Sequence, residues 1–185
     1  MNLVTRATVK AFLEIPTATT TYDSLIDSLI TQYSKRAERF CNRLFEKTAR
    51  TQKFNAGRKI IFLPAYPIDE SSNLSVTIDD TVQTIDEDYY VYYDEGFIEF
   101  DTTPSYTTPL QITVTWTGGY DSESIPDDLQ YAVMKQVAFV FRRRKDVGVS
   151  SVSLPDGSLA VNSPDDLLPE VRHILRNYRK TPGMR

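Results

Sequence analysis

Residues that build metal and redox sites are scarce in this sequence. Its 185 residues include one cysteine, Cys41, and one histidine, His173. A single cysteine cannot close an intramolecular disulfide, and one residue of each kind is too few for a structural zinc site. We therefore expect a protein that folds without cross-links or metal and is made in the reducing cytoplasm.

Long apolar runs are also absent. No stretch approaches the roughly 20 apolar residues that span a bilayer, and the first ten residues lack the basic-then-apolar order of a signal peptide. Hydrophobic residues make up 41% of the chain and charged residues 25%, which is close to the globular average. We expect a soluble protein of one domain, or of two small ones that share a core, without membrane contact.

The motifs of common enzymes are missing too. The chain has no Gly-x-x-x-x-Gly-Lys loop, no Gly-x-Gly-x-x-Gly fingerprint, no His-Glu-x-x-His pair and no Gly-x-Ser-x-Gly elbow. Paired acids such as Asp79/Asp80 and Asp127/Asp128 lie where a turn or a helix start explains them. We predict that the protein is not an enzyme and uses no cofactor or metal. A small hydrolase that uses the acidic turns is an alternative.

Charge is unevenly distributed along the chain, although the net charge is only -4. Residues 1–62 carry 11 Lys+Arg and 5 Asp+Glu, residues 63–141 carry 1 and 15, and residues 142–185 carry 9 and 5. The acidic middle is explained either by solvated turns or by a surface that matches a basic neighbour and repels nucleic acid.

The N-terminal part has the periodicity of two helices. Thr5 is a suitable cap for a short helix that reaches Phe12, and residues 22–45 carry apolar side chains at helical spacing. The opposite face of the long helix has a basic stripe of Lys35, Arg36, Arg39 and Arg43. Such a stripe is typical of a solvated face; a small DNA-binding module that contacts phosphates through it is the alternative function.

Between residues 47 and 118 the period changes to that of strands. Leu110, Ile112, Val114 and Trp116 alternate with polar residues, as in a strand with one buried face. Turn residues at 79–80 and 94–96 predict two hairpins, and strands also fit residues 52–55 and 59–63 on either side of Ala56-Gly57. We expect five or six strands in a small antiparallel subdomain.

A third long helix is predicted from Pro126 to about Lys145. It is apolar almost all round, which requires burial on more than one side. Either it is the centre of a compact bundle, or another subunit covers one of its faces. Residues 149–161 then form a hairpin around Pro155-Asp156-Gly157, with edges that are poorly protected against pairing with a neighbour.

The last predicted helix, residues 168–178, has one apolar face formed by Val171, Ile174, Leu175 and Tyr178, with Arg172, Arg176 and Arg179 beside it. It either docks in a partner groove with an acidic rim or packs back on its own bundle. The fold class is therefore α+β: a helical bundle of residues 1–46 and 121–185 with an inserted antiparallel β subdomain at residues 47–120.

Several segments, taken in order, resemble the head-tail connector (adaptor) proteins of long-tailed bacteriophages. They are L-V-T-R-A-T-V-K-A-F-L at the start, A-E-R-F-C-N-R-L-F at the end of the long helix, I-I-F-L-P-A-Y-P-I after it, G-G-Y-D followed by I-P-D-D-L, and L-P-E-V with Y-R near the end. The Arg-rich helix end and the Ser-Val-Ser/Asp-Gly-Ser loop also fit. The resemblance covers nearly the whole chain, and the acidic β subdomain is its most variable part.

The resemblance implies a non-enzymatic structural protein of the virion neck that acts in virion assembly. Its copies form a ring, usually dodecameric, beneath the portal; genome DNA passes through the ring without sequence-specific binding, and a stopper or tail-completion protein docks on the far side. We expect portal binding by Val171, Ile174, Leu175, Arg176, Tyr178 and Arg179. We expect subunit contacts through Met134, Val137, Phe139, Phe141, Val149, Val152, Leu154, Leu159 and Val161.

Overall fold

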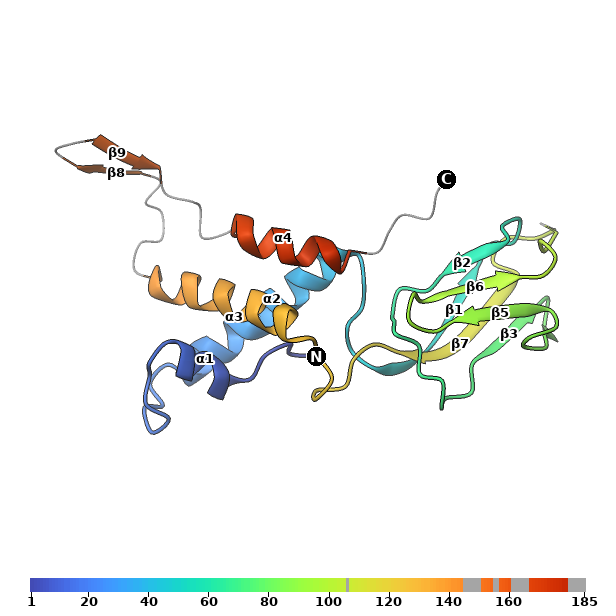
Figure 1. Ribbon diagram of the computed structural model, residues 1–185, viewed down its shortest axis with the longest axis horizontal. Helices are drawn as coiled ribbons and strands as arrows, with labels where there is room; N and C mark the ends of the chain where they lie inside the picture. Colours follow the sequence, from blue (N-terminus) through green and yellow to red (C-terminus); the bar gives the residue numbers. More distant parts are fainter. Residues whose placement is uncertain (106, 145–150, 155–156, 161–166, 180–185) are drawn as a thin grey trace. The chain divides into compact units, whose positions relative to one another are not determined.

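The computed structural model describes residues 1–105, 107–144, 151–154, 157–160 and 167–179. Its contacts divide the chain into two compact units. Residues 1–41 and 125–179 form a helical unit, and residues 42–124 form a β unit. The expected α+β class is therefore confirmed (Figure 1).

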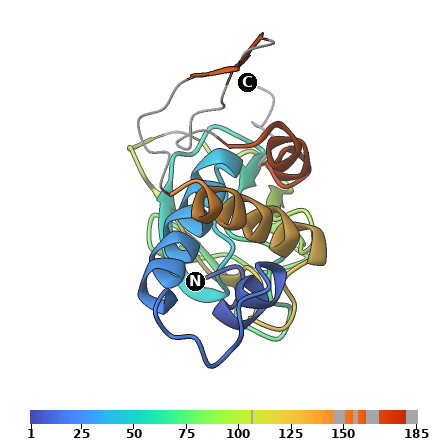
Figure 2. The ribbon, with the colours of Figure 1, turned by 90° about the vertical axis from the view of Figure 1, so that its left-hand side faces the viewer.

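The helical unit is built around α3 (Asp127–Arg142), which contacts α1 (Arg6–Phe12), α2 (Asp23–Cys41) and α4 (Pro169–Asn177). Figure 2 shows α3 between these three helices. Its side chains Leu129, Ala132 and Val137 have no exposed surface, and Ile26 of α2 and Leu175 of α4 are equally buried. The apolar character of α3 is explained by its central place in the bundle.

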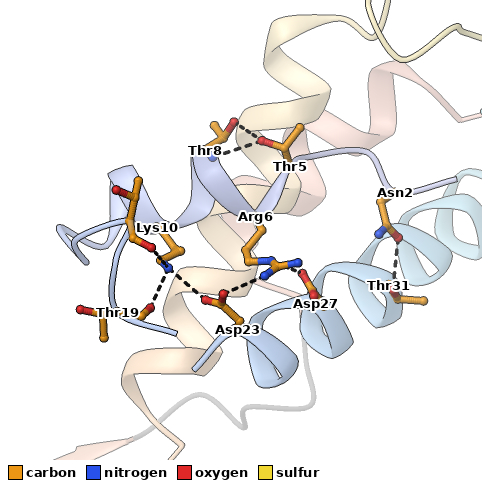
Figure 3. Close-up of polar contacts among 10 residues, drawn as sticks. Asn2, Thr5, Arg6, Thr8, Lys10, Thr19, Asp23, Asp27 and Thr31 are labelled. Carbon is orange, nitrogen blue, oxygen red and sulfur yellow. Dashed lines mark hydrogen bonds and ion pairs between the residues drawn. The ribbon is translucent and has the colours of Figure 1, made fainter. Parts of the chain in front are cut away.

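The loop that joins α1 to α2 is fixed by polar contacts. The Nζ of Lys10 donates to the backbone oxygens of Thr17 and Thr19 at 2.9 and 2.7 Å and to Asp23 at 3.0 Å. Arg6 reaches Asp23 at 2.7 Å and Asp27 at 2.9 Å (Figure 3). At the start of α1 the predicted cap is present, because Thr5 Oγ1 accepts from the Thr8 amide at 3.2 Å.

α2 ends at Cys41, one turn earlier than the periodicity predicts. Asn42 takes the left-handed conformation with φ 48°, which ends a right-handed helix. The expected helical range of residues 22–45 is therefore too long. Arg43 and Phe45 belong to the β unit.

In its described residues the β unit holds two antiparallel sheets. One has the order β1-β7-β3-β4 and contains β1 (Thr48–Phe54), β7 (Ile112–Gly118), β3 (Ser75–Ile78) and β4 (Thr81–Val82). The other has the order β2-β6-β5 and contains β2 (Ile60–Phe62), β6 (Phe97–Phe100) and β5 (Tyr89–Tyr92). Val76, Val114 and Trp116 of the first sheet share one core with Ile61 and Ile98 of the second.

Both predicted hairpins form. β3 pairs with β4 across Asp79 and Asp80, which both have positive φ, as a two-residue hairpin turn requires, and β5 pairs with β6. The strands expected on either side of Ala56-Gly57 do not pair with each other, however. β1 pairs with β7 and β2 pairs with β6, so Ala56-Gly57 connects two different sheets.

The late hairpin is also present. β8 (Ser151–Leu154) pairs antiparallel with β9 (Gly157–Ala160), and Val152 is opposite Leu159. Val149 and Val161, the limits of the predicted segment, and the turn residues Pro155 and Asp156 lie outside the described residues, as does the tail from Lys180.

Candidate interaction surfaces

The side chains that most often serve in catalysis or metal binding do not come together in one site of the described residues. Cys41 is buried in the helical unit and donates from Sγ to the Leu175 backbone oxygen at 3.3 Å, and His173 is exposed on α4. Within the part of the chain that the structure describes, no three His, Cys, Asp or Glu side chains are arranged to hold a metal ion. The same part contains no helix that is long and apolar enough to cross a membrane.

The helical unit carries a groove of about 470 Å³, here named the arginine groove. Arg36 and Arg39 of α2 and Arg172 of α4 line it together with Phe40 and two further residues, Gln32 and Leu167. Leu167 is buried and Phe40 is half-buried, so they contribute apolar surface, whereas Arg39 is exposed. The groove therefore combines guanidinium groups with an apolar lining.

Packing of α4 on the bundle brings these arginines together. Val171 and Leu175 are buried against it, which places Arg172 near the face of α2 that carries Arg36 and Arg39. Arg36 and Arg39 make no ion pair with any described residue. The sequence analysis placed Arg172 on the last helix but did not connect it with these two arginines, because only the tertiary fold brings α2 and α4 together.

Arg43 does not belong to the predicted basic stripe. It lies past the end of α2 and is buried in the β unit, where its guanidinium is 3.4 Å from the centre of the Tyr66 ring. It donates to the Tyr66 backbone oxygen and, at 3.1 Å, to the Tyr120 hydroxyl. A side chain held in this way cannot contact a DNA phosphate. On the helix, the DNA-binding alternative keeps only Lys35, Arg36 and Arg39.

The surroundings of Arg43 join three of the quoted sequence motifs. Arg43 and Phe45 come from the segment that follows α2, Tyr66 from the Tyr-Pro-Ile segment and Tyr120 from Gly-Gly-Tyr-Asp. We name these four residues the Arg43 cluster. Lys47 forms ion pairs with Asp69 at 3.1 Å and with Asp121 at 3.2 Å. The hydrogen bond to Asp69 contributes most to raising the pKa of Lys47, and the hydrogen bond to Asp121 adds to it. Packing within the β unit therefore explains why these three motifs carry their aromatic residues and Arg43.

The predicted subunit contacts of α3 divide into two classes. Val137 and Phe141 are buried inside the bundle, and the Phe141 ring meets the Tyr22 ring edge-on at 5.3 Å. Because both side chains pack within the bundle of their own chain, almost no surface of either is left exposed for the predicted contact with a neighbour. Met134 and Phe139 are partly exposed and remain predicted contacts. The backbone of the hairpin strands places Val152 and Leu154 on β8 and Leu159 on β9.

The predicted portal-binding residues of α4 differ in exposure. Val171 and Leu175 are buried against the protein's own bundle, because the apolar face of α4 packs on α3 and α2. The alternative in which this face packs back is therefore correct for these two residues. Ile174 and Tyr178 are partly exposed, and two further predicted residues, Arg176 and Arg179, are exposed.

The β unit presents an exposed loop of residues 84–88, here named the acidic loop. Its backbone is tied down: the Thr84 amide donates to the Asp88 carboxylate at 2.7 Å, and the Asp88 amide donates to the Thr84 oxygen at 2.9 Å. Asp86 has a φ of 66° and donates from its amide to the Tyr89 oxygen at 2.8 Å. The carboxylates of Asp86 and Glu87 are exposed, and Ile85 between them and β4 is 39% exposed.

Known structures share this fold. A chain in the neck of an empty gene transfer agent particle, with C6 symmetry, is 16% identical and aligns with a TM-score of 0.64 over 96% of this chain and 90% of its own. A chain in the neck of the native particle, with C12 symmetry, is 14% identical and aligns with a TM-score of 0.60 over 96% and 89%. A chain in the virion of the native particle aligns with a TM-score of 0.58 at 14% identity, over 95% and 90%.

The sequence comparison gives the family. No curated protein matches the sequence. The family model described as head completion protein matches residues 2–181, which include both units and all four helices of the described chain. The expected resemblance to phage head-tail proteins is thereby confirmed at the level of the family: the chain belongs to the head completion protein family.

Proposed function

We propose that this protein is a head-tail connector that forms a ring beneath the capsid portal in the neck of a virion. The observation that carries the proposal is the family match over residues 2–181. The fold shared with chains of gene transfer agent necks supports it, because the alignment covers 96% of this chain. The C12 symmetry of one of those necks suits a dodecameric ring.

The ring has a structural task and uses no enzyme activity or cofactor. It lets genome DNA pass through its lumen without sequence-specific binding and offers its far side to a stopper or tail-completion protein. The acidic β unit suits such a passage, since its carboxylates repel phosphates. Partners are therefore the portal, neighbouring copies and the next protein towards the tail.

The exposed part of α4 is the proposed portal contact. Val171 and Leu175 anchor the helix in the bundle, which leaves Arg176 and Arg179 exposed beside the partly exposed Ile174 and Tyr178. Two cations on a rigid helix suit an acidic rim on the portal. Met134 and Phe139 of α3 and the β8–β9 hairpin are the proposed contacts between copies.

Removal of the gene from its phage tests the proposed function. DNA-filled heads and free tails should accumulate unjoined, because the neck is incomplete, and electron microscopy counts them directly. Addition of the purified protein should restore joining, whereas the Arg176→Glu/Arg179→Glu protein should restore it poorly. Normally joined particles in the absence of the gene would contradict the proposal.

A further inference from the structure

We infer that the arginine groove of one copy of this chain receives the acidic loop of a second copy. The inference names a contact between neighbours in the proposed ring, and so it rests on the proposed function. It concerns two surfaces, one on each unit of the chain, that carry opposite charge and similar apolar character.

The groove brings positively charged side chains together. Three guanidinium groups, of Arg36, Arg39 and Arg172, line one space of about 470 Å³. Like charges in one groove repel each other, and no ion pair from the described residues relieves Arg36 or Arg39. An anionic occupant would remove this repulsion and satisfy the planar donors of the guanidinium groups.

The groove also has an apolar lining that a simple anion would leave uncovered. Leu167 and Phe40 line the groove together with the arginines, and α2 supplies Gln32 as a further polar group. A volume of this size accommodates a few side chains. It favours a short peptide segment with carboxylates and one apolar residue over a DNA duplex, which presents phosphates without an apolar side chain.

The acidic loop has this composition. Asp86 and Glu87 expose carboxylates that pair with no described residue, and Ile85 is exposed immediately before them. The hydrogen bonds between Thr84 and Asp88 hold the loop in one conformation, so little conformational entropy is lost on binding. Ile85 would cover the apolar lining while the two carboxylates meet the arginines.

The groove and the loop are different surfaces, so the contact between them determines which symmetry an assembly can have. A contact between a groove on one copy and a loop on the next is heterologous, and heterologous contacts generate closed rings when the rotation between copies closes. The helical unit carries the groove and the β unit carries the loop, so each copy has one of each. This arrangement suits the ring of the proposed function.

Charge reversal on each surface tests the contact in the full chain. The groove variant is Arg36→Glu/Arg39→Glu, and the loop variant is Asp86→Lys/Glu87→Lys. Their matched controls are Lys53→Glu/Arg58→Glu and Asp94→Lys/Glu95→Lys, which make the same charge changes at other exposed positions of the β unit. Self-association is measured by sedimentation velocity at low salt, up to about 1 mM protein, the weakest affinity of interest.

Wild type should self-associate in a concentration-dependent and salt-sensitive way. Each reversed variant alone should bind itself at least about tenfold more weakly, the two controls should behave as wild type, and an equal mixture of the two reversed variants should regain association. Recovery in the mixture also proves that both variants are folded. Melting temperatures provide a second check.

Three outcomes would overturn the contact: wild type that stays monomeric at the highest concentration, reversed variants that associate as wild type does, or a mixture of folded variants without recovery. Failure of the proposed function is seen separately, as the absence of the wild-type protein from purified particles. A protein that is present in particles but lacks this charge dependence would retain the function and lose the inferred contact.

Discussion

Lys10 is a charged side chain that the fold buries, with 4% of its surface exposed. Its Nζ has three partners, the backbone oxygens of Thr17 and Thr19 and the carboxylate of Asp23. A buried ammonium group is tolerated when all its protons are donated in this way. Lys10 thereby holds the chain between α1 and α2 against the bundle.

Replacement of Lys10 by Met should therefore destabilise the helical unit by about 2 kcal/mol, because an acceptor carboxylate and two carbonyl groups lose a charged donor. Lys35→Met on the exposed face of α2 is the control and should leave stability unchanged within about 0.5 kcal/mol. Urea unfolding followed by circular dichroism measures both. Equal stability of the two variants would show that the Lys10 contacts contribute nothing.

Asp23 makes the same region sensitive to acid. Hydrogen bonds from Lys10 and then from Arg6 lower the pKa of Asp23 below its ordinary value of 3.8. A carboxylate with a lowered folded-state pKa stabilises the protein above its unfolded pKa, and this stabilisation is lost as pH falls through the folded value. The loss should therefore occur below pH 3.8.

The Asp23→Asn variant should be less stable than wild type at neutral pH, and the difference between the two should shrink below the ordinary pKa of 3.8. The reason is that acid removes from wild type the charge that the variant already lacks. Unfolding curves at neutral pH and at about pH 2.5 give the difference at each end. A constant difference at both pH values would contradict the hydrogen bonds assigned to Asp23.

At the scale of elements, the turn between β5 and β6 depends on Gly96. Its φ is 71°, and a Cβ atom at this position would lie 2.4 Å from the Cβ of Tyr66, a member of the Arg43 cluster. A substitution therefore meets two obstacles: a left-handed backbone and a collision with a side chain that packs under Arg43.

Gly96→Ala should cost clearly more than the about 1 kcal/mol that a left-handed backbone alone imposes on alanine. Gly57→Ala is the matched control, since Gly57 also has positive φ, 89°, but is exposed. Thermal unfolding of the two variants separates backbone strain from collision. Equal melting temperatures would mean that Tyr66 moves aside freely.

The buried face of α4 should contribute to the stability of the helical unit. Leu175→Ala should destabilise the helical unit by about 2–5 kcal/mol, the usual cost of a cavity at a fully buried leucine. Arg176→Ala on the exposed side should leave the melting temperature unchanged and weaken portal binding. If Leu175→Ala melted as wild type does, α4 would not be part of the bundle core.

Elements were predictable from sequence where local chemistry decides them. Thr5 as a cap, the alternation along β7 and the turn at Asp79-Asp80 all act within a few residues. The end of α2 was missed because apolar spacing continues past Cys41, although Asn42 changes the backbone. The partners of β1 and β2 were not predictable because β7 and β6 lie far away in sequence.

The interaction surfaces were predictable to a smaller extent. The sequence pattern grouped Arg36 and Arg39 in one basic stripe, but it also included Arg43, which the fold buries against the Tyr66 ring. On α4 the apolar stripe was recognised, but whether it packs inward or outward depends on the surface of α3 and α2. A pattern identifies an apolar face; only tertiary packing decides what covers it.

At the scale of the whole molecule, the uneven charge has a structural explanation. The acidic residues of the middle segment concentrate in the β unit, and the helical unit presents the arginine groove and the exposed arginines of α4. A molecule with surfaces of opposite sign on its two units is suited to contacts with copies of itself and with different partners on different sides.

The chain belongs to the head completion protein family. The central proposal is that its copies assemble as a ring on a portal. Native mass measurement of the protein mixed with the portal ring of its own phage tests it most directly, with each component alone as the control. We expect a complex that contains one portal ring and twelve copies of this chain, the number that suits C12 symmetry. A portal ring that stays unoccupied, or that binds a single copy under the same conditions, would contradict the account.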